Sequence, residues 1–448
     1  MPEQFESARK PMRQRQLPRP LMPFRHSAYR RLALALVLSA FASGIWIVAQ
    51  VWEVIRIGGG TAQLSVVSTA GAVGVLLPSL LAGVVADRVP QKLILLCVAS
   101  VRVVGMCLVA ALSVSDNTRL WHLATVALMT GMASAFYYPA YNAWIPALVP
   151  EKDLMAVNGF EGMIRPTIGQ AIGPGVAGAV VGAFSSGAAL GIAAAASMAS
   201  LAALALVPLT SVRQESAVEV NVARGVRSAL IDMRDGVSYV VRTPWLLATL
   251  LFASVMMLMM AGPFEVLVPF LIKDQLDGGP GDHALVMAAF GIGGAVGSLT
   301  MASLRMPRRY LTVMNMMWGV SCLPFLAVAF ADGIVVVVGA SCVLGAMFTA
   351  PSVIWGTLLQ RRSPPHMLGR LASLDSFVSI SLIPVSMALS GPVSNALGLG
   401  TTFVIAAVVP VIAAVLATVC ARLPADEVAH PLKDGSDQVD ISSAPERS

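Results

Sequence analysis

Long apolar stretches alternate with short polar connections along nearly the whole chain. A helix needs about 20 mostly apolar residues to cross a membrane, and each of these stretches is long enough to do so. The pattern therefore predicts an all-α membrane protein with twelve transmembrane helices. Their expected ranges are 33–55, 63–86, 93–114, 121–146, 156–183, 187–208, 244–271, 284–304, 309–330, 333–358, 370–394 and 400–422.

One long polar connection separates the first six predicted helices from the last six. It predicts a cytoplasmic linker between two six-helix bundles, and its second part carries apolar residues at helical spacing. The predicted domains are a basic N-terminal tail (1–30), an N-terminal bundle (31–208), the linker (209–243), a C-terminal bundle (244–422) and a C-terminal tail (423–448).

Short motifs of the first half recur in the second half, 212 to 217 residues later. Recurrence in a constant register indicates two duplicated halves, which is typical of transporters whose site lies between the repeats at the membrane midplane. The pairs are Trp52-Glu53-Val54 with Phe264-Glu265-Val266, the segment from Arg88 to Lys92 with that from Arg305 to Arg309, Pro139 with Pro351, and Leu154-Met155 before Glu161 with Met367-Leu368 before Asp375.

The composition excludes a soluble protein. Hydrophobic residues make up 56% of the chain and charged residues only 12%, whereas soluble domains have about 25% charged residues. The net charge of +6 does not indicate nucleic-acid binding, because Arg and Lys gather in loops that would all lie on one side of the membrane. By the positive-inside rule we expect a multi-pass protein of the bacterial plasma membrane with both termini in the cytoplasm.

No motif indicates catalysis, a metal or a cofactor. The chain has no HExxH, no GxSxG and no nucleotide-binding loop, and its histidines are scattered. We therefore expect no catalytic residue and rank an intramembrane enzyme or a scaffold last among the alternatives. The cysteines predict no disulfide and no metal site, because they lie in apolar stretches without metal-ligand spacing. They are Cys97, Cys107, Cys322, Cys342 and Cys420.

The connection between predicted helices 2 and 3 carries a distinctive motif. Gly83, Asp87, Arg88 and Lys92 follow the pattern G-x-x-x-D-R-x-x-x-K. A carboxylate beside basic groups at a membrane boundary can form an ion pair in one conformation and lose it in another. The motif resembles the signature of the major facilitator superfamily, which implies a gate at this place and a fold of two pseudo-symmetric six-helix bundles.

The second copy of this motif keeps basic residues but has no acid. Arg305, Arg308 and Arg309 are present, while Leu304 occupies the position of the aspartate. The resemblance therefore implies an asymmetric gate with its acidic member in the N-terminal half.

Predicted helix 5 contains Gly169, Gly173, Pro174 and Gly178. Small residues four positions apart allow close helix packing, and proline bends a helix. Ordinary packing explains this pattern, but the pattern also resembles the glycine-proline motif of major facilitator exporters, which favours efflux over uptake.

Three further segments resemble the subgroup that contains the enterobactin exporter and macrolide efflux proteins. The resemblance implies proton-coupled export of amphipathic drugs or a siderophore-like metabolite by alternating access. Import of a small solute and transport of a lipid are the alternatives of the same fold, and we expect a monomer that contacts membrane lipids and a small-molecule substrate. The segments are Pro139-Ala140 with 146–150, residues 236–245, and residues 365–370.

Charged residues within the predicted spans are candidates for proton coupling, because charge in a membrane is costly unless paired or hydrated. Glu265 is the strongest candidate, since it follows the Gly262-Pro263 break and has no basic residue three or four positions away. Glu53 has Arg56 three residues on, which predicts a permanently charged pair.

Four other charged residues have structural alternatives. Glu161 and Arg165 are spaced to neutralise each other on one helix face. Asp375 is expected to pair with the Arg88 and Lys92 segment rather than to titrate alone. Arg102 serves either packing or the inner gate.

Predicted helix 4 carries aromatic side chains near its inner end, and predicted helix 7 carries a run of methionines. Aromatic and thioether side chains suit a pocket for bulky amphipathic ligands. An interfacial aromatic belt or core packing explains the same residues. The pocket candidates are Tyr137, Tyr138, Tyr141, Asn142, Met256, Met260, Phe348 and Trp355.

Overall fold

The computed structural model describes residues 23–150, 153, 157, 160, 161, 164–208, 237–304, 306–362 and 368–431, and these ranges contain helices but no strand. Ten of the described helices are long and apolar enough to cross a membrane. Helix α4 and the shorter apolar helix Thr167–Ala183 occupy the two remaining predicted spans. The predicted all-α membrane fold is confirmed.

The helix bounds follow the apolar stretches closely. The first half contains α1 (Ser27–Arg56), α2 (Thr61–Arg88), α3 (Gln91–Val114), α4 (Leu120–Leu148), the π-helix η3 (Arg165–Ile172), α6 (Gly173–Ala183) and α7 (Ser186–Ala205). The second half contains α9 (Pro244–Gly262), the π-helix η4 (Pro263–Leu267), α10 (Val268–Asp274), α11 (Pro280–Ser303), α12 (Tyr310–Ser321), α13 (Pro324–Ala329), α14 (Ile334–Arg362), α15 (Leu368–Ser381), α16 (Ile383–Leu397), α17 (Leu399–Cys420) and α18 (Leu423–Ala429).

Four predicted spans are interrupted rather than continuous. Each interruption has a proline in the first two positions of the segment that follows. Proline has no N–H to donate and its ring clashes with the preceding turn, so it breaks the regular hydrogen-bond ladder of a helix. The prolines are Pro166, Pro263, Pro324 and Pro384.

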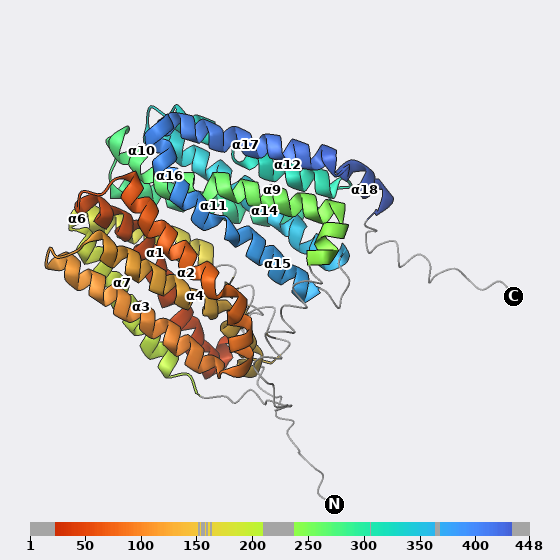
Figure 1. Ribbon diagram of the computed structural model, residues 1–448. Coiled ribbons are helices and arrows are strands. Elements are labelled where there is room, and N and C mark those ends of the chain that lie inside the picture. The colour runs from red at the N-terminus through yellow and green to blue at the C-terminus, as the bar shows by residue number, and fades with distance from the viewer. Residues whose placement is uncertain are drawn as a thin grey trace, which may run out of the picture.

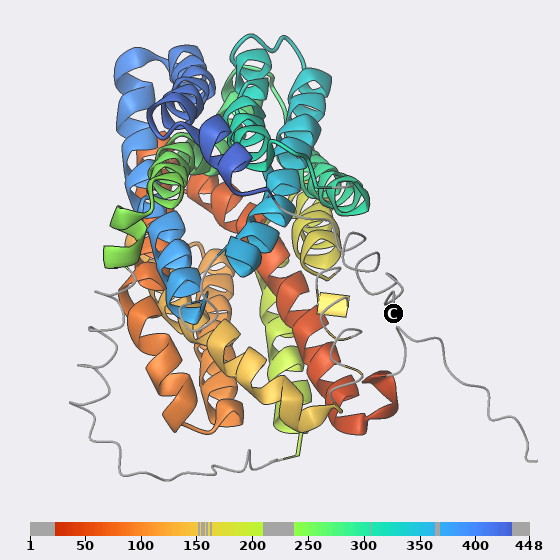
Figure 2. The ribbon, with the colours of Figure 1, turned by 90° about the vertical axis from the view of Figure 1, so that its right-hand side faces the viewer.

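The helices form two groups that correspond to the two halves of the chain. Figure 1 shows α1 to α7 in red to yellow-green and α9 to α18 in green to blue, and Figure 2 shows the same groups one above the other. The groups meet where α1 ends and where α2 and α11 begin, here called the seal end. They diverge toward the opposite end, where α1 begins, here called the Ser27 end (Figure 1).

Two glycine contacts hold the groups together at the seal end. A Cβ atom on Gly178 of α6 would lie 2.6 Å from the Cβ of Ala284 of α11, so only glycine allows this approach. A Cβ atom on Gly391 of α16 would lie 2.6 Å from the hydroxyl of Ser65 of α2. The Gly391 N–H donates a 3.0 Å hydrogen bond to that hydroxyl. We call these two contacts the seal.

The first residues of the predicted C-terminal tail fold onto the second bundle as α18. Glu427 accepts hydrogen bonds from the backbone N–H and the hydroxyl of Thr312, in the first turn of α12. A carboxylate is favourable there because the first N–H groups of a helix lack partners within it. Asp426 forms an ion pair of 2.5 Å with Arg362 at the end of α14.

Candidate functional site

A cavity with two lobes lies between the bundles. The first lobe, here the N lobe, has a volume of about 430 Å³ and is lined mainly by α1, α2, α3 and α4. The second, here the C lobe, has about 300 Å³ and is lined mainly by α9, η4 and α11. The two lobes are adjacent, because they share five lining residues. Ile47, Gln50, Ser68, Glu265 and Ile383 line both lobes.

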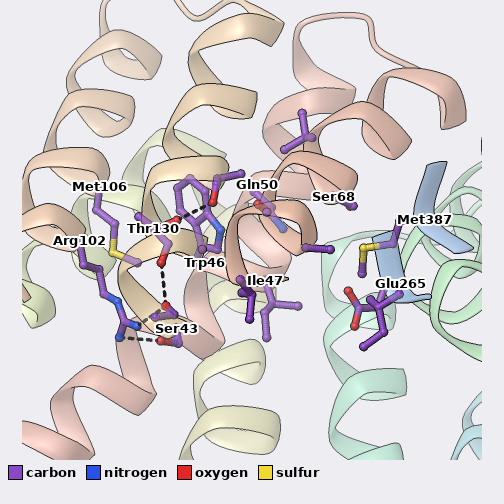
Figure 3. Close-up of a pocket in the computed structure, with 18 of the residues that line it drawn as sticks. Ser43, Trp46, Ile47, Gln50, Ser68, Arg102, Met106, Thr130, Glu265 and Met387 are labelled. Atoms are coloured by element: carbon purple, nitrogen blue, oxygen red, sulfur yellow. Dashed lines mark hydrogen bonds between the residues drawn. The ribbon is translucent and has the colours of Figure 1, made fainter. Parts of the chain in front are cut away.

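The N lobe contains a cation. Arg102 of α3 donates from Nη1 to the hydroxyls of Ser39 and Ser43 on α1, at 2.5 and 3.1 Å. Its Nη2 lies 3.4 Å from the hydroxyl of Ser134 on α4. Figure 3 shows Arg102 and Glu265 on opposite sides of this space, with Trp46 and Ile47 between them.

The C lobe is lined by thioether and aromatic side chains. The rings of Phe264 and Phe290 are 4.7 Å apart, and those of Phe290 and Phe348 are 6.4 Å apart. Met257 and Met260 extend this wall, which also includes the buried imidazole of His283 and the side chain of Gln170. The thioether side chains adapt to apolar ligands of different shapes, so the C lobe can accept the apolar body of an amphipathic molecule.

Glu265 lies in the shared wall, within the π-helix η4. Its side chain is exposed to the cavity, whereas the adjacent Phe264 and Val266 are 5% and 0% exposed. Among the described residues, none forms a hydrogen bond or an ion pair with its carboxylate. π-Helical turns are frequent at functional sites because they redirect a side chain.

A serine of the neighbouring helix contributes to this break in α9. The Ser386 hydroxyl donates a 2.6 Å hydrogen bond to the carbonyl of Leu258 and accepts one from the N–H of Gly262. These two backbone groups are the partners that a regular α-helix would join directly. A side chain that bonds to both groups is a known cause of helix bending, and this one lies just before Glu265.

 
Glu53, the repeat mate of Glu265, lies near the end of α1 and has a different environment. Glu53 is fully buried and forms an ion pair of 2.8 Å with Arg56. It also accepts hydrogen bonds from the hydroxyls of Ser113 and Ser186, at 2.9 and 2.6 Å. The expected pair is present, and its partners tie α1 to α3 and α7.

Only the Lys92 half of the expected Asp375 pairing can be compared with the structure, because the Arg88 side chain lies outside the described residues. The Asp375 carboxylate accepts a 3.0 Å hydrogen bond from Nε1 of Trp355, on the neighbouring α14. Lys92 instead donates to the carbonyls of Ala205 and Val207, at the end of α7. The predicted Lys92 pair is therefore wrong for this conformation, because Lys92 satisfies backbone carbonyls of its own bundle.

The expected gate motif lies at the Ser27 end. Gly83, Asp87 and Arg88 belong to the last turns of α2, and Lys92 belongs to the first turn of α3. The side chains of Gly83, Asp87 and Arg88 lie outside the described part of the molecule, so the gate remains a prediction.

The glycine-proline motif of predicted helix 5 packs against two different partners. A Cβ atom on Gly173 would lie 2.8 Å from the Cα of Gly44, and Gly169 faces Ala40, both on α1. Gly178 instead contacts the other bundle at the seal. The motif therefore serves packing within the first bundle and contact between the bundles.

The pair predicted for Glu161 and Arg165 cannot be assessed, because the Arg165 side chain lies outside the described residues. Glu161 lies beside the phenol groups of Tyr29 and Tyr141. Tyr141 is only 1% exposed and stacks on Tyr137, with ring centroids 5.6 Å apart.

The predicted pocket residues do not share one environment. Met260 and Phe348 line the C lobe, and Tyr137 borders a smaller cavity next to Arg102. Met256 is buried in the core and Tyr138 is 44% exposed. The remaining three lie away from both lobes. Tyr141 is buried, Asn142 is exposed, and Trp355 binds Asp375.

Sequence reasoning missed the polar side of the N lobe. Arg102 was considered only for packing or the inner gate, and its serine partners lie about 60 positions away on another helix. The available signal was an arginine in the middle of an apolar span. Gln50, Ser43, Trp46 and Thr130 also line this lobe.

The comparisons with known proteins agree with this architecture. A family model described as transmembrane secretion effector matches residues 19–442. The chain belongs to this family of the major facilitator superfamily. It is accordingly a membrane transporter and not an enzyme, as predicted.

The relatives with similar sequences include named efflux pumps. The multidrug efflux pump Tap of Mycolicibacterium fortuitum is 23% identical over 401 residues, which cover 88% of this chain and 95% of that protein. Macrolide efflux protein A of Streptococcus pyogenes is 24% identical over 328 residues, which cover 72% and 78%.

A solved structure shows the same fold. A variant of the nucleoside transporter NupG superposes with a TM-score of 0.70 at 15% identity, over 88% of this chain and 99% of that one. The likeness establishes the arrangement of helices and carries no information on substrate.

Proposed function

We propose that this protein exports amphipathic compounds, drugs or a siderophore-like metabolite, in exchange for protons. The two-lobed cavity, with a carboxylate in its wall and an apolar C lobe, supports this function. The named relatives support export, since the multidrug efflux pump Tap and macrolide efflux protein A are similar over most of the chain.

Glu265 is the observation that carries the proposal. A coupling carboxylate must bind and release a proton as the cavity changes the side to which it opens, so it has to face the cavity and lack a permanent cationic partner. Glu265 meets both conditions among the described residues. Glu53, its repeat mate, meets neither, because it is buried against Arg56.

Alternating access would use the seal and the gate motif in turn. In this conformation the bundles are joined at the seal end and diverge toward the Ser27 end (Figure 1). If the Ser27 end faces the cytoplasm, as the basic residues indicate, this is the state that loads substrate from inside. In the opposite state, the Asp87 motif would close the Ser27 end.

The test uses proteoliposomes with an imposed proton gradient and a panel of lipophilic cations, macrolides and siderophores. Glu265→Gln should abolish gradient-driven accumulation but still allow downhill equilibration of the same substrate. Glu53→Gln is the matched control, because it makes the same chemical change at the repeat mate and should have the smaller effect on coupling.

Full gradient-driven transport by Glu265→Gln would refute the assignment of Glu265. The coupling proposal would then pass to Asp375, whose Asn variant is measured in the same vesicles. Transport that ignores the proton gradient in the unmodified protein would refute proton coupling altogether.

A further inference from the structure

Arg102 is a cation in the middle of a membrane-spanning helix, and no described carboxylate contacts it. All its hydrogen bonds go to serine hydroxyls and one serine carbonyl, on α1 and α4. A charged side chain at this depth is costly unless paired or hydrated, so its presence indicates a function. The proposed proton site does not use it.

The guanidinium group keeps donors free for a ligand. A guanidinium has five N–H donors in a rigid plane. Here Nη1 is engaged by Ser39 and Ser43, Nη2 has one long contact of 3.4 Å, and Nε has no partner among the described residues. Nε and Nη2 form one edge of the group, and such an edge matches two oxygens of a carboxylate, sulfonate or phosphate.

The position of Arg102 connects its guanidinium group with the cavity. Arg102 lines the N lobe, and Glu265 lies on the opposite side, as Figure 3 shows. The apolar C lobe continues from the wall that holds Glu265. A molecule that spans both lobes would therefore meet a cation at one end and, at the other, mainly thioether and aromatic groups, with His283 and Gln170 among them.

We propose that Arg102 binds an anionic group of the substrate, a carboxylate, sulfonate or phosphate. The substrates are then amphiphiles with an acidic end in the N lobe and an apolar body toward the C lobe. The inference rests on the proposed function only in treating the cavity as the substrate site, and it does not depend on proton coupling. The serine hydroxyls fix the guanidinium plane, so that the free edge is positioned before the ligand arrives.

The test compares two probes with the same ring system and opposite charge, naphthalene-2-sulfonate and naphthalen-2-ylmethylammonium. Binding is measured by equilibrium dialysis on the full-length protein in phosphatidylcholine nanodiscs, with empty nanodiscs subtracted and no ion gradient. Arg102→Gln should weaken sulfonate binding by about tenfold to a hundredfold, the value of hydrogen bonds to a charged group. Ammonium binding should change by less than about threefold.

Two further variants make the result specific. Arg102→Lys keeps the charge but loses the two-donor edge, so it should weaken sulfonate binding less than Arg102→Gln does. This variant also remains a test if Arg102→Gln fails to insert into the membrane. Arg119→Gln, at the exposed position before α4, removes an equal charge outside the cavity and should leave both probes unaffected.

The outcomes separate a ligand site from a packing role. Unchanged sulfonate binding in Arg102→Gln, or equal weakening of both probes, would overturn the proposal and leave Arg102 as a tether between α1, α3 and α4. Nanodiscs with phosphatidylglycerol address lipid as the source of the anion. If that lipid lowers sulfonate affinity in the unmodified protein but not in Arg102→Gln, the site binds a lipid headgroup and the solute assignment is overturned.

Failure of this proposal is distinguishable from failure of the proposed function. Charge-selective binding together with transport that ignores the proton gradient would support the Arg102 site and refute coupling. Coupled transport with no charge selectivity would refute the Arg102 site alone.

Discussion

The Ser386 hydroxyl accepts a 2.8 Å hydrogen bond from the backbone N–H of Gly262. Because the same hydroxyl donates to the Leu258 carbonyl, helix α16 is bonded to both ends of the last turn of α9. The orientation of Glu265, three residues further on, therefore depends on a residue more than a hundred positions away in the sequence. Movement of α16 against α9 would reach the carboxylate directly.

Ser386→Ala should impair transport more than stability. Without the hydroxyl, the Gly262 N–H can pair with the Leu258 carbonyl, so the cost in folding free energy should stay near 1 kcal/mol or less. The straightened turn should reorient Glu265 and reduce gradient-driven transport several-fold. Ser390→Ala is the control, because that hydroxyl donates only within its own helix, to the Ser386 carbonyl. Equal transport by both variants would contradict the role of the bridge.

Gly178→Leu should open the seal. The new side chain cannot fit against Ala284 and Pro280 of α11, so the conformation joined at the seal end should lose population. Spin labels at positions 61 and 395, whose native side chains are hydrogen-bonded across the bundles, should show longer distances in a background without the native cysteines. Gly182→Leu is the matched control, since no atom lies within 4 Å of a Cβ atom there.

Glu53→Gln should lower stability. The substitution leaves Arg56 without its buried partner and weakens two serine hydrogen bonds. We expect a loss of about 1 to 3 kcal/mol, because breaking a buried pair is costly while Arg56 retains some contact with solvent. Thermal denaturation of the purified protein measures it. Asp274→Asn, which breaks the exposed pair with Lys273, should cost less than about 0.5 kcal/mol.

Asp87→Asn should impair transport without preventing folding or membrane insertion. If the motif closes the gate in the opposite state, loss of the charge changes the balance of two conformations rather than the core. Transport assays on a variant with normal expression and melting temperature check this. Asp332→Asn, an exposed acid in the connection before α14, should be neutral. Normal transport by Asp87→Asn would reduce the motif to a topological anchor.

Reporter tags should place both termini and the central linker in the cytoplasm. The arginine distribution requires this result for tags within 1–30, 209–243 and 425–448. A tag in the connection between α3 and α4, which lies at the seal end, should report the opposite side. A linker tag outside the cytoplasm would contradict the six-plus-six topology.

Much of the fold could be predicted from the sequence, because each span is a local apolar stretch of sufficient length. The breaks at Pro263 and Pro384 also have a local cause, since proline disfavours a regular helix, although Pro78 and Pro351 lie inside continuous helices. Glu265 could be singled out because it follows such a break and lacks a basic neighbour on its own helix.

The partners between helices could not be predicted in the same way. Arg102 with Ser43, and Trp355 with Asp375, are neighbours only after the helices pack. The methionine run of α9 did not predict which side chains line the cavity either. Met256 and Met260 lie on one helix face, and of these two only Met260 reaches the cavity. Composition indicates that such side chains exist, but the packing decides which of them meet.

The seal has a consequence for the origin of the molecule. Gly178 and Gly391 are 213 residues apart, the same register that relates the other repeated motifs, and each contacts the beginning of a helix in the opposite half. Each half thus contributes one glycine and one helix start to these contacts. This is the self-complementary geometry of a twofold homodimer. A single ancestral half could have associated with a second copy of itself through these two contacts before the genes were joined.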